Sequence, residues 1–460
     1  MAAMDRQGAP ASGAAIAARL DRLPLSRLHV AILALATLGL AADIGEVALS
    51  NTFAAILAAP PTSASRGEIA LLLAAVFAGG AIGAPAFGWW GDRAGRRAAL
   101  QIALAVVTLS SLAVAASPSI AAMTAFRFFS GLALGAYPPL TAAYLADTLP
   151  PQRRGVLMML CAALAFLGAP AMVLLIRWLT PLAPLGVDGW RWALIAGAAL
   201  AAVTAALLSL VPESPRWLAA LGRNVDAERG CRRFEASAGV ASIDAPQLSR
   251  AAAVADAPAS DSGFRALAAA PRHIRRFALL AALYGLGPWA TIGFPLLSAA
   301  VMVHKGFHVN DSLLFAGLSM FGPTLGIGVV APLVDRIERR RALMLCAAVM
   351  AAIGLGFAIG TELTPLIALG TAFNLLSAVY SAVLALYAAE LFPTPLRASA
   401  TAAAWGGGRA VSAVVPLALL PLLAAQGPIP MFSVIAAALL ASLVLILVAG
   451  PPGRARQAIE

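Results

Sequence analysis

The chain has 460 residues, of which 61% are hydrophobic and 12% charged, and its mean hydropathy is +0.87. A soluble domain is about 45–50% apolar and about 25% charged, so this composition excludes a soluble globular protein. The net charge of +11 does not indicate nucleic-acid binding, because the basic residues lie in short loops between long apolar runs.

The apolar runs have the length of membrane-spanning helices, which need about 20 residues each. We expect an all-α membrane protein with 12 transmembrane helices in two pseudo-symmetric six-helix bundles. The expected spans are residues 28–58, 68–90, 98–116, 121–145, 156–178, 190–211, 277–300, 312–333, 342–361, 365–389, 399–424 and 430–449. The expected domains are a tail 1–27, a first bundle 28–211, a central loop 212–276, a second bundle 277–449 and a tail 450–460.

Two segments depart from simple spans. The seventh run contains Gly285, Gly287, Pro288, Gly293 and Pro295, which predicts a broken or bent helix. The central loop is rich in Ala, Ser, Asp and Arg, and we expect short interfacial helices and a linker there.

The loop arginines predict the orientation. They gather before the first run, after the second, fourth, eighth and tenth runs and in the final tail, whereas the opposite loops hold few. Because Lys and Arg favour the cytoplasmic side, we expect both termini in the cytoplasm of a bacterium. The protein would lie in the inner membrane, surrounded by lipid bilayer, as a monomer with no nucleic-acid partner.

Nothing in the sequence indicates an enzyme. Cys161, Cys231 and Cys346 show neither disulfide nor ligand spacing, and His304 and His308 have no metal partner. No phosphate-binding loop or catalytic constellation occurs, so we expect neither a metal nor a cofactor.

An internal repeat divides the chain into homologous halves at a fixed offset of 243 positions. Many transporters built from paired halves place one substrate site where the halves meet. The recurring pairs are Asp92 with Asp335, Arg96 with Arg339, Tyr144 with Tyr387, Asp147 with Glu390, Pro150 with Pro393 and Arg154 with Arg397.

Several motifs resemble the major facilitator superfamily. They are Gly88-x-x-x-Asp92-Arg93-x-Gly95-Arg96-Arg97, Arg127-Phe-x-x-Gly131-x-x-x-Gly135, Tyr144-x-x-Asp147 to Arg153-Arg154-Gly155, and Pro212-Glu213-Ser214-Pro215-Arg216-Trp217-Leu218. The last is similar to the sugar porter hallmark. The stretch Glu390-Leu-Phe-Pro393-Thr394-Pro-x-Arg397, followed by Arg409, is similar to metabolite:proton symporters, including niacin and aromatic-acid carriers.

This resemblance implies a cytoplasmic salt-bridge network that latches the halves in the outward-open state. Its expected members are Asp92, Arg96, Asp147, Arg154, Glu213, Arg216, Asp335, Arg339, Glu390 and Arg397. Sugar porters usually carry Glu in place of Asp147, and their sugar-binding amides are missing from 156–176 and 277–300. A hexose substrate is therefore disfavoured.

Two carboxylates lie inside the first run. Asp43 and Glu46 are about one turn apart, and a charge at membrane depth costs about 2.5–3.5 kcal/mol on insertion scales. Desolvation favours the protonated carboxyl and a nearby arginine favours the ionised one, so a pair that opens and closes with conformation can carry a proton. In the resembled carriers the first-span Asp and fourth-span Arg have this role, which implies Asp43 with Arg127. The alternative is a fixed structural pair, and Glu46 either lines the cavity or reaches the outer interface.

Arg409 in the eleventh run is the expected substrate anchor. It follows Trp405 and three glycines, and a guanidinium suits bidentate binding of a carboxylate while the indole suits a ring. The alternative roles of Arg409 are snorkelling and helix packing. Further candidates for the substrate cavity are Asn51, Tyr137, Tyr284, Trp289, Asn374 and Tyr380.

These features predict a proton-coupled secondary transporter of a small organic acid or aromatic metabolite, working by alternating access. Asp43 would carry the proton, Arg127 would modulate it and Arg409 would attract the anion. The alternatives are a proton-driven exporter of drugs or metabolites and a nutrient sensor that binds without transporting. Sensors commonly carry a long signalling tail, whereas this chain stops at Glu460.

Overall fold

The structure is a computed structural model that describes residues 13–57, 64–240, 271–331, 338–392 and 394–451. Within these ranges, 12 helical segments are long and apolar enough to cross a membrane. Asp335 lies outside the described residues, as do the side chains of Asn51 and Arg397.

The first half, which we call the N half, contains six spans. They are α2 (Arg27–Ile56), α3 (Arg66–Ala94), α4 (Arg96–Ala116), α5 (Ile120–Leu134) with α6 (Tyr137–Thr148), α7 (Arg154–Ala165) with α8 (Gly168–Leu179), and α9 (Gly189–Leu207). Three further helices lie outside the spans: α1 (Gly13–Arg22), α10 (Pro215–Ala220) and α11 (Asn224–Ala238).

The second half, the C half, contains the other six spans. They are α14 (Pro271–Thr291) with α15 (Gly293–His304), α16 (Val309–Ser319) with α17 (Gly322–Val330), α18 (Arg339–Ile359), α19 (Leu363–Leu391), α20 (Thr394–Gln426) and α21 (Pro428–Ala449). The predicted class, an all-α membrane protein with 12 spans, is confirmed.

Prolines explain why four spans consist of two helices. The seventh span breaks at Ile292, one turn before Pro295, because proline lacks an N–H and its ring clashes with the carbonyl four residues earlier. The predicted break in this span is thus confirmed. The same relation holds at Gly135–Ala136 before Pro139, at Phe166–Leu167 before Pro170 and at Met320–Phe321 before Pro323. By contrast, Pro85, Pro288, Pro416 and Pro421 lie inside helices that continue.

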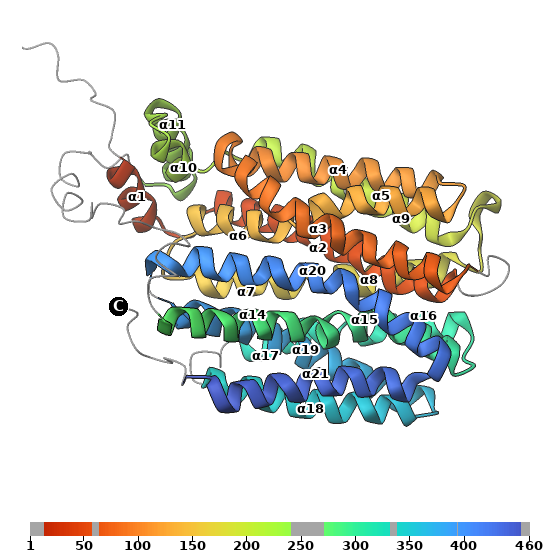
Figure 1. Ribbon diagram of the computed structural model, residues 1–460. Coiled ribbons are helices and arrows are strands. Elements are labelled where there is room, and N and C mark those ends of the chain that lie inside the picture. Colours follow the sequence, from red (N-terminus) through yellow and green to blue (C-terminus); the bar gives the residue numbers. More distant parts are fainter. Residues whose placement is uncertain (1–12, 58–63, 241–270, 332–337, 393, 452–460) are drawn as a thin grey trace, which may run out of the picture.

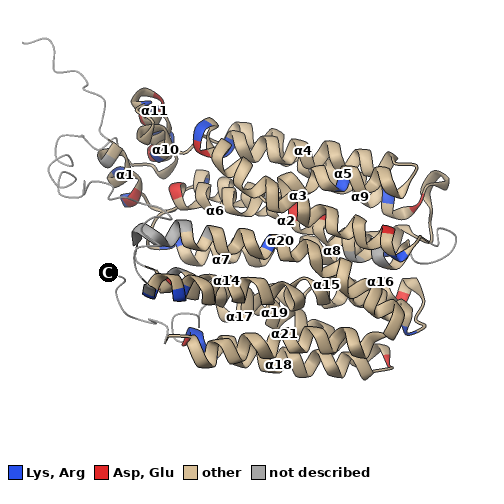
Figure 2. Ribbon diagram, viewed as in Figure 1, with Lys and Arg blue, Asp and Glu red and all other residues tan. Residues whose placement is uncertain are grey.

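The two halves lie side by side along their length (Figure 1). Across the seam, α3 packs against α20, α2 against α15, α7 against α17 and α8 against α16. Helices α1, α10 and α11 project from one end, and charged residues gather at the two ends of the bundle (Figure 2). We call the end with α1, α10, α11 and the first residues of α4 and α18 the basic end, and the opposite one the far end.

Glycines bring α3 and α5 into close contact. A Cβ atom on Gly131 would lie 2.2 Å from the carbonyl oxygen of Val76, and one on Gly79 would lie 2.2 Å from that of Phe128. Small residues at helix crossings allow backbones to approach in membranes, where lipid supplies no hydrophobic force between helices. Close packing at Gly131 and Gly135 therefore holds α5, and with it Arg127, against the rest of the N half.

We expect Gly131→Ala to destabilise the protein, because the added methyl group would overlap the backbone of α3. Overpacking typically costs about 1–3 kcal/mol, and the measurement is the thermal unfolding temperature of the purified protein in detergent. Gly155→Ala is the matched control, since nothing lies within 4 Å of a Cβ atom there. Equal shifts for the two variants would contradict the packing role.

Candidate functional site

A fully buried ion pair joins α2 to α5. Arg127 Nη1 donates to Glu46 Oε1 at 2.6 Å, and the two side chains are 0% and 2% exposed. Arg127 Nη2 donates to Ser50 Oγ at 2.5 Å, and the guanidinium also faces the ring of Phe53, whose centroid lies 5.6 Å from Cζ. Hydrogen bonds around a buried charge pair are what make its burial tolerable.

This arrangement corrects the expected partner of Arg127. The resemblance implied a pair with Asp43, but the structure pairs Arg127 with Glu46, one turn further along α2. The physical reason is depth: α5 starts at the far end of the bundle, and Arg127 lies in its second turn, level with the part of α2 that carries Glu46 and Ser50.

Asp43 instead faces Arg409 of the C half. The two residues line a cavity of about 20 Å³, which is room for about one water molecule. The remaining lining is apolar side chains and glycines of α2, α3 and the junction of α5 with α6. The residue predicted to carry a proton and the residue predicted to anchor a substrate therefore share one cavity where the halves meet.

These two charges attract each other without a direct bond. Arg409 is the opposite charge that acts on Asp43, but no contact of 4.0 Å or less joins them. Asp43 Oδ1 and Arg409 Nε have no hydrogen-bond partner, although Asp43 is only 6% exposed. A buried polar atom without a partner costs about 1–3 kcal/mol, so both groups retain capacity for a ligand.

Aromatic side chains of the C half lie beside Arg409. The Trp405 ring centroid is 4.9 Å from Arg409 Cζ, and Tyr284 meets the Trp405 ring edge-on at 5.8 Å between centroids. A Cβ atom on Gly408 would lie 2.8 Å from the carbonyl oxygen of Tyr284, so this glycine allows α14 and α20 to approach. The arrangement offers a cation next to flat apolar faces.

The other predicted cavity residues differ in their surroundings. The Tyr137 hydroxyl packs against Gly39 of α2, close enough to Asp43 to interact electrostatically, and has no hydrogen-bond partner. Asn374 donates to the carbonyl oxygen of Ser319 at 3.2 Å, which joins α19 to α16. Tyr380 is buried with an unpartnered hydroxyl, and Trp289 is half-buried against the core of the C half.

The repeated residues of the predicted latch form matching contacts within each half. Arg96 lies 3.8 Å from Asp147 in the N half, and Arg339 lies 3.1 Å from Glu390 at the same offset in the C half. Asp92 pairs with Arg96 at 2.6 Å. These described pairs join residues of one half, so the latch between halves stays a prediction.

Tyrosines and arginines that recur in the repeat bond to the backbone near the end of the sixth span of each half. Tyr144 donates to the carbonyl oxygen of Pro212 at 2.5 Å, and Tyr387 to that of Pro451 at 2.9 Å. Arg97 donates to Val211 O at 2.9 Å, and Arg340 to Ile446 O at 3.2 Å. Arg97 and Arg340 also recur at the offset of 243.

The hallmark around Glu213 is a hydrogen-bonded turn. The Glu213 carboxylate accepts from the backbone N–H of Arg97 at 3.1 Å and from that of Ser214 at 2.9 Å. The Ser214 hydroxyl donates to Asp147 at 2.9 Å. These bonds attach α10 to the start of α4 and the end of α6.

Sequence reasoning missed Asp21, which lies just outside the first span. Its carboxylate pairs with Arg216 and lies 4.0 Å from Arg154, two predicted members of the latch. The available signal was the helical spacing of Ile16, Leu20 and Leu23, which predicts an amphipathic helix before the first span. In this conformation an acidic residue of the N half neutralises both arginines.

Arg19 holds α1 in place on α11. It bonds to both oxygens of Glu235 at 2.8 Å and to Glu228 at 2.6 Å and 3.1 Å. The hydrogen bond to Glu235 raises the pKa of Arg19, against burial. Burial would raise the pKa of Glu228, but hydrogen bonds from Arg19 and Arg232 outweigh it and lower that pKa below 4.5.

The Glu46–Arg127 pair and Asp43 should differ sharply when each carboxylate is replaced by its amide. We expect Glu46→Gln to cost about 3–5 kcal/mol, because it leaves a buried arginine without a counter-charge. We expect Asp43→Asn to fold with little change, since Asp43 makes no direct bond to lose. Thermal unfolding in detergent measures both, and equal destabilisation would contradict the assignment.

We expect Arg19→Ala to release α1 from α11. Hydrogen exchange of residues 13–22 should rise at neutral pH, whereas Arg22→Ala, at an exposed position of the same helix, should leave it unchanged. Because the pKa of Glu228 is lowered, its contribution to docking is complete above pH 4.5 and is lost as the pH falls through the lowered value. Equal hydrogen exchange of residues 13–22 in the Arg19→Ala and Arg22→Ala variants would contradict the role of Arg19.

Comparison with known proteins agrees with this architecture. The family described as "Sugar (and other) transporter" matches residues 37–455. The putative metabolite transport protein YyaJ of Bacillus subtilis is 28% identical over 441 residues, which cover 95% of this chain and 96% of that one. The niacin transporter NiaP of Acinetobacter baylyi is 26% identical over 344 residues, 71% of this chain and 72% of that one.

A solved structure shares the fold. The xylose transporter XylE from E. coli, in a partially occluded inward-open conformation, superposes with a TM-score of 0.75 at 17% identity, covering 94% of this chain and all of that one. The chain therefore belongs to the sugar (and other) transporter family, and it is a 12-span membrane transporter of the major facilitator superfamily.

Proposed function

We propose that this transporter couples the uptake of a small organic acid or aromatic metabolite to the entry of protons. The observation that carries the proposal is the position of Asp43 and Arg409, which come from different halves and line one cavity without bonding to each other. Alternating access moves the halves relative to one another, so the separation of these two charges changes during transport.

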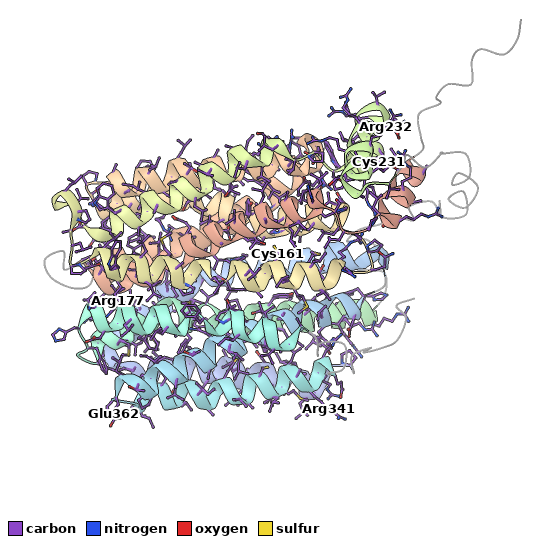
Figure 3. The ribbon with its side chains drawn as sticks, turned by 180° about the vertical axis from the view of Figure 1, so that it is seen from behind. Cys161, Arg177, Cys231, Arg232, Arg341 and Glu362 are labelled. Atoms are coloured by element: carbon purple, nitrogen blue, oxygen red, sulfur yellow. The ribbon has the colours of Figure 1, made fainter. Side chains whose placement is uncertain are left out.

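The orientation follows from the arginines. Lys and Arg of short loops favour the cytoplasm, so the basic end would be cytoplasmic, as would both termini. At the far end, Arg177 of α8 donates to the carbonyl oxygen of Asn310 of α16 at 3.3 Å, across the seam. Figure 3 places Arg177 at the end opposite to Cys231 and Arg232. This bond across the far end is consistent with an inward-facing conformation, and one structure of the xylose transporter is partially occluded and inward open.

The chemistry of the residues at this site matches an acidic substrate better than a sugar. Sugars present hydroxyl groups, which amide side chains bind well, and residues 156–176 and 277–300 contain no Gln or Asn. A half-buried guanidinium with an unpartnered Nε–H, next to Trp405, suits a carboxylate attached to a ring. The similarity to a niacin transporter supports the same class of substrate.

The Glu46–Arg127 pair has a structural role in this proposal. It is hydrogen-bonded on both sides and lies within the N half, so movement of the halves does not separate it. Asp43 is the carboxylate that has no fixed partner and is therefore the one that can bind and release a proton during the cycle.

We expect Asp43→Asn to abolish accumulation driven by a pH gradient. In proteoliposomes that are acidic outside, the wild-type protein should concentrate radiolabelled nicotinate or benzoate. The variant should only equilibrate them, while retaining exchange of internal for external ligand. Glu362→Gln, at an exposed site on the C half, is the control and should behave as the wild type. Undiminished gradient-driven accumulation by Asp43→Asn would refute the coupling role, and extrusion under the same gradient would favour a proton-driven exporter.

A further inference from the structure

We infer that the substrate's carboxylate and Asp43 exchange places on Arg409, so that one monocarboxylate and one proton cross the membrane together without net charge. This inference rests on the proposed function and adds to it a binding order, a stoichiometry and a limit on substrate charge. Its basis is that the site presents one available guanidinium to two carboxylates.

Space in the cavity allows one carboxylate at Arg409. With Asp43 facing Arg409, the volume of about 20 Å³ admits a water molecule and no larger group. The lining on α3 and at the junction of α5 with α6 is apolar, so it offers no second cation. Within this cavity, a substrate carboxylate can reach the guanidinium only after Asp43 has given way.

Arg409 is available because its donors are not used up. A guanidinium has five N–H groups in a fixed fork, which suits a carboxylate with two oxygens. Arg409 makes no hydrogen bond or ion pair with another described residue, whereas both terminal nitrogens of Arg127 are bonded, to Glu46 and to Ser50, and only its Nε is unpartnered. A substrate carboxylate that binds Arg409 therefore satisfies donors that the empty site leaves unpaired.

Because of the charges around Asp43, binding of the substrate favours protonation of Asp43. The groups that face it are Arg409 on α20, Glu46 on its own helix and the phenol of Tyr137 on α6, and Glu46 is neutralised by Arg127 on α5. When the substrate neutralises Arg409, an ionised Asp43 becomes an unpaired charge in an apolar site. Binding of the anion and binding of a proton thus favour each other, and the linkage is reciprocal.

The site has the same net charge when it is empty and when it is loaded. The empty site holds the Asp43 carboxylate and the Arg409 guanidinium, with no net charge. The loaded site holds protonated Asp43, the guanidinium and the substrate anion, again with no net charge. The proton comes from the outer medium onto a carboxylate oxygen of Asp43, and it leaves to the cytoplasm when the anion departs and Asp43 faces Arg409 again.

The same balance of charges limits the substrate to one carboxylate group. A second negative charge would meet no cation among the lining residues of this cavity, whose charged members are Asp43 and Arg409. The neighbouring faces of Trp405 and Tyr284 are suited to a flat ring attached to that carboxylate. Nicotinate and benzoate are therefore suitable probes, and nicotinamide is the uncharged control.

Calorimetry on the purified protein tests the exchange directly. Titration with nicotinate and with benzoate, in buffers of different ionisation enthalpy, gives the number of protons taken up per ligand. We expect one proton for the wild type and for the exposed control Glu362→Gln, and none for Asp43→Asn, which should still bind. In the pH range where Asp43 is ionised, the wild-type Kd should rise about tenfold per pH unit, and that of Asp43→Asn should stay constant. Binding without proton uptake by the wild type would overturn the exchange.

Transport in proteoliposomes tests the stoichiometry. A pH gradient should drive nicotinate accumulation to the same level with and without an inside-negative potential set by potassium and valinomycin. Accumulation driven by the potential alone would overturn the one-proton exchange while leaving the proposed acid transport intact. If neither probe binds nor accumulates under any gradient, the proposed function fails together with the inference.

Discussion

A charge inside a membrane must find an opposite charge, because lipid offers it neither water nor hydrogen bonds. This chain meets that constraint in two different ways one turn apart on α2. Glu46 is bonded to one terminal nitrogen of Arg127 and Ser50 to the other, so this pair is closed. Asp43 is opposed by Arg409 without contact and with hydrogen-bonding capacity unused, so this pair is open. The closed pair stabilises the N half, and the open pair is suited to bind ligands.

Helix packing decides which of the two carboxylates belongs to the closed pair and which to the open pair. Gly79 and Gly131 allow α3 and α5 to touch, and this contact holds Arg127 at the depth of Glu46. Arg409 faces Asp43 from the other half, because α20 packs against α3 at the seam. The closed pair therefore lies within one half, whereas the open pair joins residues of the two halves.

The internal repeat is best explained by the rigidity of each half. Tyr144 and Tyr387 bond to the backbone beyond the sixth span of their own half, and Arg96 and Arg339 pair with acids of their own half. Such contacts keep the six helices of each half together. Asp21 adds a feature outside the repeat, since it neutralises Arg216 and lies near Arg154 from a helix before the first span.

The sequence by itself determined the membrane environment, the 12 spans, the two homologous halves and the break in the seventh span. These properties depend on composition and on local patterns such as apolar run length and the position of a proline, which act within a few residues. The same patterns showed that Asp43, Glu46, Arg127 and Arg409 need an explanation, because charges are rare inside spans.

Only the tertiary structure decided which of these charges meet. Residues three apart on a helix differ by about 60° around its axis, so Asp43 and Glu46 share a face, and the sequence gives no reason to prefer one as the partner of Arg127. The choice depends on the depth and rotation of α5 and α20 against α2, which result from glycine contacts and packing across the seam. For the same reason the contact of Asp21 with Arg216, 195 positions away, follows only from the folded chain.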